Sequence, residues 1–329
     1  SWEASRYAVT LGVSCEACHL GARQHVESAG HVLPSFAPVN PDLRVEPRQV
    51  SPSQRRHENI NWACGRCHVG SRPRFVAGMA TWNSVEYSDA MRGSCYSQLN
   101  CVECHNPHRA IGPRWTPSAD QDDAVCLKCH KQYRPADKRV KHTHHPAGSE
   151  GARCMNCHMP RINEGVEDVV RTHMIYSPTQ AAMIEANQPN ACNLCHTDKP
   201  IDWTLRALKE WYGTTFNEER IASNYPEGGK PVGLGWLASK NESVRLVAVE
   251  AMTRRQDFST LPRLLDALDD PYLVNRQFAY KGLQDMLKVR LSDFGYRFYM
   301  TSEERRKPLA DVRARFAPAA RLKFGSPTP

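Results

Sequence analysis

The chain has 329 residues, 40% of them hydrophobic, and its 43 Lys and Arg against 35 Asp and Glu give a formal charge of +8. This length suffices for about two domains with buried cores. No apolar run approaches the roughly 18 residues of a spanning helix, so a polytopic membrane protein is excluded, and prolines spread along the chain argue against disorder throughout. The informative number is the cysteine count, which is 13.

Twelve of the 13 cysteines belong to one pattern, Cys-x-x-Cys-His, which occurs six times. This is the attachment signature of c-type haem, in which two thiols bond the porphyrin vinyl groups and the histidine becomes the proximal iron ligand. The attachment cysteines are Cys15 and Cys18, Cys64 and Cys67, Cys101 and Cys104, Cys126 and Cys129, Cys154 and Cys157, and Cys192 and Cys195. The proximal histidines are His19, His68, His105, His130, His158 and His196. The sequence therefore predicts six haem c groups, with iron, as cofactors.

Three other uses of cysteine pairs explain this pattern less well. A disulfide framework does not require a histidine after every second cysteine, and zinc knuckles do not place histidine directly there. A thioredoxin-like redox motif usually occurs once, beside a βαβ unit. Because haem c is attached outside the cytoplasmic membrane, we expect a periplasmic or extracellular protein of a bacterium or archaeon. The sequence begins at Ser1 without Met, so we expect an exported chain whose signal peptide has been removed.

Eight histidines lie outside the motifs, all of them before residue 174. Neutral imidazole is the commonest metal ligand, so these histidines are the candidate distal iron ligands, with surface or core packing as the alternative for each. The candidates are His25, His31, His57, His108, His142, His144, His145 and His173. We expect His108 to serve a haem other than its own, one of His25 and His31 to be a ligand, and the run from His142 to His145 to supply one or two.

The methionines and the remaining cysteine are weaker candidates for iron ligands. Met155, Met159 and Met174 are candidate thioether ligands, and packing is the alternative for each. Cys95 fits no attachment spacing. It is interpreted as a buried small apolar residue, a thiol for intermolecular or haem-adjacent contact, or an iron ligand.

All six motifs fall within residues 1–200, where proline and glycine are frequent and apolar side chains are too few for an ordinary core. We therefore expect a hexahaem cytochrome domain over 1–200, mainly α with long loops and almost no sheet, in which the porphyrins form the core. The segment 201–329 has neither Cys nor His. Apolar residues recur there at helical spacing, which predicts a helical domain that begins with a helix over 202–213 closed by Gly213.

Two segments of this second domain, 243–252 and 274–283, repeat each other at an offset of 31 residues. Paired helices at such a period are typical of an α-solenoid and resemble HEAT repeats, with an ordinary helical bundle as the alternative. Asp270 and Pro271 are the expected N-cap and first residue of the second helix. Thr301 and Glu304 predict a capping box for a last helix that reaches about Phe316.

The motifs GVSCEACH, CY…LNCVECHNPH, ARCMNCHMP, RTHMI and ACNLCHTDKPIDWT resemble those of multihaem cytochromes related to the tetrahaem cytochrome of ammonia oxidisers, within the superfamily of hydroxylamine oxidoreductase and pentahaem nitrite reductase. The resemblance covers roughly residues 10–210. It implies alternating parallel and perpendicular haem pairs, bis-histidine ligation and electron transfer. By position it implies distal roles for His108 and His173. Such proteins commonly carry another haem motif upstream of GVSCEACH, which is missing here.

Three functions are compatible with these features. The first is electron transfer along six mostly bis-histidine haems, with the helical tail mediating contacts with redox partner proteins; no catalytic residue is then needed. The second is an enzyme that acts on a small nitrogen or sulfur compound at one open haem. The third is a subunit of a homo-oligomer, a larger complex or an extracellular cytochrome filament. Because six haems bring about −6 of charge when oxidised, the holoprotein is close to neutral, and nucleic acid is not an expected partner.

Overall fold

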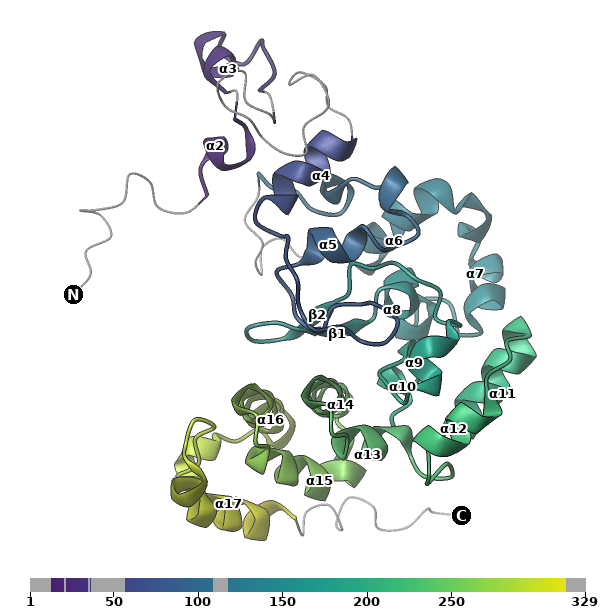
Figure 1. Ribbon diagram of the computed structural model, residues 1–329, viewed down its shortest axis with the longest axis vertical. Helices are drawn as coiled ribbons and strands as arrows, with labels where there is room; N and C mark the ends of the chain where they lie inside the picture. The colour runs from purple at the N-terminus through teal and green to yellow at the C-terminus, as the bar shows by residue number, and fades with distance from the viewer. Residues whose placement is uncertain (1–12, 21, 35, 37–56, 109–117, 318–329) are drawn as a thin grey trace, which may run out of the picture. The chain divides into compact units, whose positions relative to one another are not determined.

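The computed structural model describes residues 13–20, 22–34, 36, 57–108 and 118–317 (Figure 1). The chain divides into two compact units. The first comprises Ser1–Ser71 and Ser84–Val125, and the second comprises Arg72–Asn83 and Cys126–Pro329. Three of the six haem motifs fall in each unit. A functional boundary at 200/201 stays a prediction.

The described part of the first unit consists of short helices joined by loops. They are α2 (Cys15–Cys18), α3 (Arg23–Glu27), α4 (His57–Gly65), α5 (Glu86–Ala90), η1 (Tyr96–Gln98), η2 (Cys101–Glu103) and most of α6 (Ala119–Cys129). Asn61 links α4 to η2, because its side chain donates to the carbonyl of Leu99 at 3.0 Å and accepts from the amide of Cys101 at 2.9 Å. A Cβ on Gly65 would lie 2.8 Å from the Tyr87 ring, so only glycine allows α4 and α5 to approach this closely.

The second unit begins with short helices and one hairpin. These elements are η3 (Lys131–Tyr133), α7 (Ala136–Thr143), η4 (Glu150–Ala152), α8 (Cys154–His158), β1 (Arg161–Glu164), β2 (Val169–Arg171), α9 (Ala181–Glu185) and α10 (Ala191–Cys195). The strands are antiparallel, with Arg161 opposite Arg171 and Glu164 opposite Val169. Among the described residues this hairpin is the only sheet. The prediction of a mainly helical chain with almost no sheet is confirmed.

Longer helices follow in the second unit. They are α11 (Ile201–Tyr212), α12 (Glu218–Asn224), α13 (Val232–Leu237), α14 (Glu242–Arg254), η5 (Phe258–Thr260), α15 (Leu261–Asp266), η6 (Ala267–Asp269), α16 (Leu273–Leu287), η7 (Leu291–Phe294) and α17 (Ser302–Phe316). Gly213 ends α11 with φ of 68°, a left-handed conformation that favours glycine. Thr301 and Glu304 form the expected capping box at the start of α17. Both predicted helix ends are confirmed.

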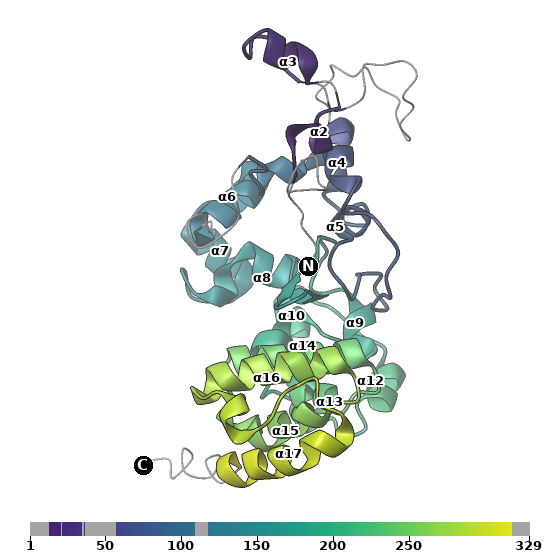
Figure 2. The same ribbon diagram turned by 90° about the vertical axis from the view of Figure 1, so that its left-hand side faces the viewer.

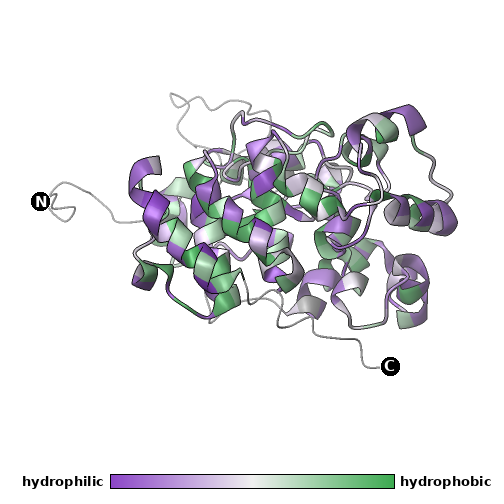
Figure 3. Cartoon of the chain, turned by 90° about the horizontal axis from the view of Figure 1, so that it is seen from below, coloured by the Kyte–Doolittle hydropathy of each residue, from purple (hydrophilic) through white to green (hydrophobic). Residues whose placement is uncertain are grey.

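The last five α-helices lie in two layers. Figures 1 and 2 show α14 beside α16, with α13, α15 and α17 on one side of them, and contacts join α14 to both α13 and α16. Seen from below, the chain carries hydrophilic and hydrophobic residues interspersed along its helices, as amphipathic helices do (Figure 3). A Cβ on Gly282 of α16 would lie 2.5 Å from the Thr253 hydroxyl of α14. The small residue therefore permits close packing of the two helices.

One hydrogen bond recurs at the offset of the sequence repeat. Arg245 Nη1 of α14 donates to the carbonyl of Ser239 at 2.8 Å, and Arg276 Nη1 of α16 donates to the carbonyl of Asp270 at 2.7 Å. Donors and acceptors are both 31 residues apart, the offset of the repeated segments. The two repeated sequence segments thus make the same arginine-to-carbonyl hydrogen bond.

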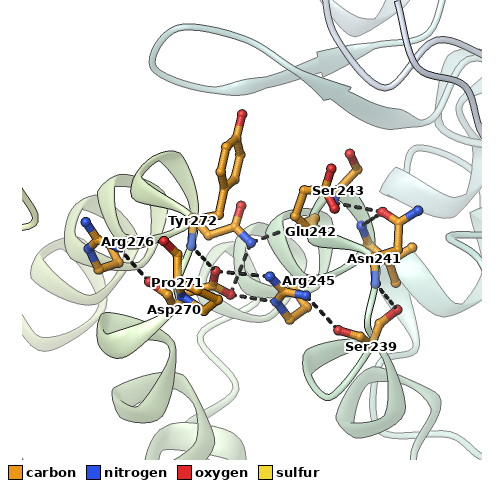
Figure 4. Close-up of polar contacts among 11 residues, drawn as sticks. Ser239, Asn241, Glu242, Ser243, Arg245, Asp270, Pro271, Tyr272 and Arg276 are labelled. Carbon is orange, nitrogen blue, oxygen red and sulfur yellow. Dashed lines mark hydrogen bonds and ion pairs between the residues drawn. The ribbon is translucent and has the colours of Figure 1, made fainter. Parts of the chain in front are cut away.

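The expected N-cap of α16 is wrong by two residues. The helix starts at Leu273 after Tyr272, and the carboxylate of Asp270 instead accepts from Arg245 Nε at 2.6 Å and Nη2 at 3.1 Å (Figure 4). It also accepts from the amide of Tyr272 at 2.8 Å. Although burial alone raises the pKa of Asp270, these hydrogen bonds lower it below its ordinary value. Asp270 joins α14 to the following loop, and this bidentate pair outweighs its capping preference.

Two apolar cores hold the second unit together. The first includes Ile162 of the hairpin, Ile184 of α9, Leu208 of α11 and Trp236 of α13. The second lies among α14 to α17 and includes Leu264, which is fully buried. The first core therefore extends across position 200. No helix in the described ranges has the length and apolar content needed to cross a membrane.

Candidate functional site

The haem motifs occupy single helical turns. In five of the six, the amide of the histidine donates to the carbonyl of the first cysteine, at 2.8 to 3.0 Å. In the fifth motif, α8 runs from Cys154 to His158 and includes the whole sequence. One turn brings the two thiols and the imidazole to the same side of the backbone, as attachment to one porphyrin requires. All 13 cysteines lie among the described residues, and each is a free thiol, which disfavours the disulfide alternative.

Attachment thiols of successive motifs lie close together. In the first unit the thiols of Cys64 and Cys101 share a hydrogen bond, which lowers the pKa of Cys64 to about 7 and raises that of Cys101. In the second unit burial and, to a smaller extent, Cys195 of the next motif raise the pKa of Cys157 to about 11. Porphyrins attached at these thiols would therefore be neighbours within each unit.

Three proximal histidines each face one histidine from outside the motifs. The ring centres of His19 and His108 lie 6.3 Å apart, with ring planes inclined by 19°. Those of His142 and His158 lie 6.2 Å apart at 2°. Those of His145 and His196 lie 6.2 Å apart at 29°. The first pair belongs to the first unit and the other two belong to the second.

This spacing fits one iron between each pair of rings. An imidazole nitrogen binds a metal at about 2.0–2.1 Å and lies about 1.1 Å from its ring centre, so two axial imidazoles have centres about 6.3 Å apart. Direct stacking is shorter, as His144 shows, whose ring lies 4.4 Å from that of Trp211 at 4°. No three His, Cys, Asp or Glu side chains converge as a metal site in the described ranges. Pairs suit haem, because the porphyrin supplies the other four nitrogens.

Hydrogen bonds at Nδ1 leave the Nε2 atoms of several of these imidazoles available to bind a metal. His158 Nδ1 lies 2.8 Å from the carbonyl oxygen of Tyr176, and His145 Nδ1 lies 2.6 Å from that of Thr143. Because a carbonyl only accepts, each Nδ1 carries the proton and leaves the lone pair of Nε2 available. His25 Nδ1 bonds the carbonyl of Val32 in the same way, at 2.8 Å.

In proximal His68, Nδ1 forms its hydrogen bond with a carboxylate and not with a backbone carbonyl. Its Nδ1 lies 2.7 Å from Glu86 Oε2. Burial raises the pKa of Glu86, but hydrogen bonds from backbone amides and from His68 lower it overall, so the carboxylate is ionised near neutral pH. An ionised partner at Nδ1 increases the basicity of a ligating imidazole.

Electrostatics also favour neutral imidazoles in the second unit. Burial lowers the pKa of His142, and the charge of His158 lowers it further. Burial and the nearby Arg255 lower the pKa of His196. A neutral ring is the form that binds iron.

Helix α11 supplies aromatic side chains to both histidine pairs of the second unit. The Tyr212 hydroxyl donates to the carbonyl of His142 at 2.5 Å. The Trp211 ring stacks on His144, and the Trp203 ring lies 4.7 Å from that of His196. The sequence reasoning missed these aromatic residues, although a Trp-Tyr pair before the closing Gly213 was visible. The first helix after residue 200 thus belongs to the surroundings of the histidine pairs.

The other candidate ligands have different surroundings. His144 stacks on Trp211, while His31 is exposed and His173 is half-buried. The structure describes the backbone of His57 at the start of α4, but its side chain lies outside the described part. Met155 is buried, and Met174 packs against the first apolar core. Cys95 is a half-buried free thiol. Distal ligation by any of the eight candidates stays a prediction.

Comparisons with known proteins agree with these motifs. Residues 96–135 match the family model described as "Doubled CXXCH motif". The chain is also 23% identical over 248 residues to a protein of Shewanella baltica (strain OS185) named "Multiheme cytochrome MtrA", a match that covers 67% of this chain and 65% of the relative. The chain thus spans just under two thirds of that relative. No solved structure matches significantly. The doubled motif and this similarity support a multihaem c-type cytochrome.

Proposed function

We propose that the chain carries electrons along six covalently bound haem c groups, most of them ligated by two histidines. The observation that carries this proposal is the set of three histidine pairs with ring centres 6.2 to 6.3 Å apart. In this assignment His108 is the distal partner of His19, His142 that of His158, and His145 that of His196. When bound, haem supplies one-electron chemistry at iron.

The residues of the chain hold the cofactors and adjust their surroundings. The cysteines hold each ring in place, and the Nδ1 hydrogen bonds orient the imidazoles. Closure of both axial positions at the three paired irons would leave no coordination site for a substrate there, which favours a carrier over an enzyme. The proximity of attachment thiols within each unit supports short steps between neighbouring haems, as transfer along a chain of cofactors requires.

The segment 201–329 has a separate role in this proposal. The repeated arginine hydrogen bonds and the two-layer packing of α13 to α17 support a HEAT-like repeat that mediates contacts with redox partner proteins. An extracytoplasmic location follows from haem c itself, since the groups are attached outside the cytoplasm. Periplasmic and extracellular sites both meet this requirement, and assembly into an oligomer or filament would extend the same chain of cofactors.

Two measurements on the purified holoprotein test the proposal. Mass spectrometry under denaturing conditions should give the chain plus six haems, and any smaller number in fully matured protein would contradict the count. Reduction should be followed by stoichiometric reoxidation by a redox partner or dye. Sustained consumption of nitrite, hydroxylamine or sulfite by the reduced protein would favour the enzyme alternative.

A further inference from the structure

A cavity of about 800 Å³ lies between the start of α17 and the loop that precedes α16. Its volume falls in the range of small-ligand pockets, roughly 300–1,000 Å³. Its lining includes the charged residues Arg276, Arg305, Arg306, Arg313 and Asp269. The lining therefore holds four guanidinium groups and one carboxylate, and its net charge is positive.

Two of these arginines are buried and fixed in place. Arg276 is 7% exposed and Arg305 is 6% exposed. Arg276 donates to backbone carbonyls, Nε to Phe298 at 2.8 Å and Nη1 to Asp270 at 2.7 Å. A carbonyl satisfies a donor without neutralising the charge, so the positive charge of Arg276 persists.

Arg305 is held in a similar way. Its Nε lies 2.5 Å from Asp269 Oδ1, and its Nη1 donates to the carbonyl of Met300 at 3.1 Å. Within the described ranges, the Nη2 atoms of Arg276 and Arg305 make no hydrogen bond, and neither is among the buried unpartnered atoms. Each arginine thus offers a donor with a fixed position that remains accessible to a ligand.

The other two arginines extend this set of donors. Arg313 Nε is buried and lacks a partner within the described ranges, although Nη2 of the same residue pairs with Asp266 at 3.0 Å. Arg306 is exposed and makes no ion pair with the described residues. Arg306 and Arg313 lie seven residues apart, two turns along one face of α17. The N-cap of this helix, Thr301, and its first residue, Ser302, also line the cavity.

We propose that this cavity binds a small polyanion through carboxylate or phosphate oxygens. The planar fork of guanidinium matches both groups and favours two parallel hydrogen bonds. The hydrogen bonds of Arg276 and Arg305 already order these buried side chains. They therefore lose little further conformational entropy when a ligand binds. The ligand would stabilise the end of the helical repeat by joining α17 to the loop before α16.

The test uses the full-length holoprotein at low ionic strength, where screening is weak. Calorimetric titrations with pyrophosphate and with citrate distinguish phosphate from carboxylate ligands, and the proposal expects saturable binding of at least one. Arg306→Ala should weaken that binding about ten-fold or more, because it removes a guanidinium that donates charge-assisted hydrogen bonds to the anion. An unchanged haem absorption spectrum and melting temperature without ligand show that the variant is folded.

Lys307→Ala is the matched control, because Lys307 is adjacent on α17, has the same charge and does not line the cavity. It should leave the affinity within about two-fold. An equal loss in both variants would reveal non-specific attraction and overturn the proposal. Absence of saturable binding to either anion would also overturn it, and binding of a poly-glutamate peptide alone would identify a protein-docking surface instead.

Discussion

The imidazole rings of His142 and His158 lie parallel within 2°, with their centres 6.2 Å apart. Direct stacking does not explain this distance, whereas one iron between the two rings does. His142 comes from the end of α7 and His158 from the haem motif in α8. In the proposed assignment the pair would join two helices through a cofactor.

Replacement of His142 by Ala should change one haem from low spin to high spin, because its iron loses a strong axial ligand. His144→Ala is the control, since His144 lies two residues away and stacks on Trp211 instead. Optical spectra and electron paramagnetic resonance of the oxidised proteins measure the number of high-spin haems. A high-spin haem in the His144 variant, or none in the His142 variant, would contradict the assignment.

Gly151→Ala should disturb the pair formed by His145 and His196. A Cβ on Gly151 would collide with the His145 ring, with its Cγ and Cδ2 atoms nearest. Because His145 is also held by its bond to the carbonyl of Thr143, the ring has little freedom to retreat. We expect a shifted low-spin signal or a new high-spin signal from one haem. Gly148→Ala is the comparison, where no atom lies within 4 Å of the added Cβ; its positive φ predicts a loss of stability without that spectral change.

Tyr212→Phe should loosen the end of α7 that carries His142, because it removes the hydroxyl that donates to the His142 carbonyl. An intramolecular hydrogen bond contributes about 0.5–1.5 kcal/mol, so a modest fall in melting temperature is expected. A spectroelectrochemical titration should show one haem potential displaced and the others unchanged. If the melting temperature falls while all potentials remain unchanged, Tyr212 has a structural role only.

Glu164 should make stability depend on pH. This carboxyl is 1% exposed, neither oxygen has a hydrogen-bond partner among the described residues, and burial followed by the charge of Glu242 raises its pKa to about 7. The group is neutral in both states at low pH. Between the ordinary carboxyl pKa and about pH 7, the unfolded chain releases this proton while the folded chain retains it. The free energy of unfolding therefore falls by at most roughly 3 kcal/mol over this range.

Glu164→Gln should therefore flatten the decline of the melting temperature between about pH 5 and 8. Glu167→Gln on the same hairpin is the control, since Glu167 is exposed. Melting followed by circular dichroism at a series of pH values provides the comparison. Identical pH profiles for the wild type and the Glu164 variant would show that this carboxyl ionises as freely in the folded as in the unfolded chain.

Local patterns could be predicted from the sequence, and long-range pairings could not. The haem motifs, Gly213 at the end of α11 and the capping box at Thr301 each depend on a few consecutive residues. The expectation that His108 serves another haem stays a prediction, and its ring faces that of His19. That partner itself could not be predicted, because it depends on the path of the chain between two distant segments.

The sequence also left the choice among His142, His144 and His145 open. His144 has a left-handed φ of 56° at the end of α7, which turns the chain between the other two. A non-glycine residue in this conformation is not evident from its letter alone. The roles of Trp211 and Tyr212 were missed for a related reason, since aromatic residues on an amphipathic helix usually indicate an ordinary apolar core.

Electron paramagnetic resonance of the fully oxidised holoprotein, with spin quantification against its haem content, is the most direct test of whether any haem iron has an open axial position. We expect low-spin ferric signals that integrate to six haems, without a high-spin component and without change when nitrite or cyanide is added. A high-spin ferric signal that shifts on addition of either ligand would contradict this expectation, because one iron would then have an open axial position.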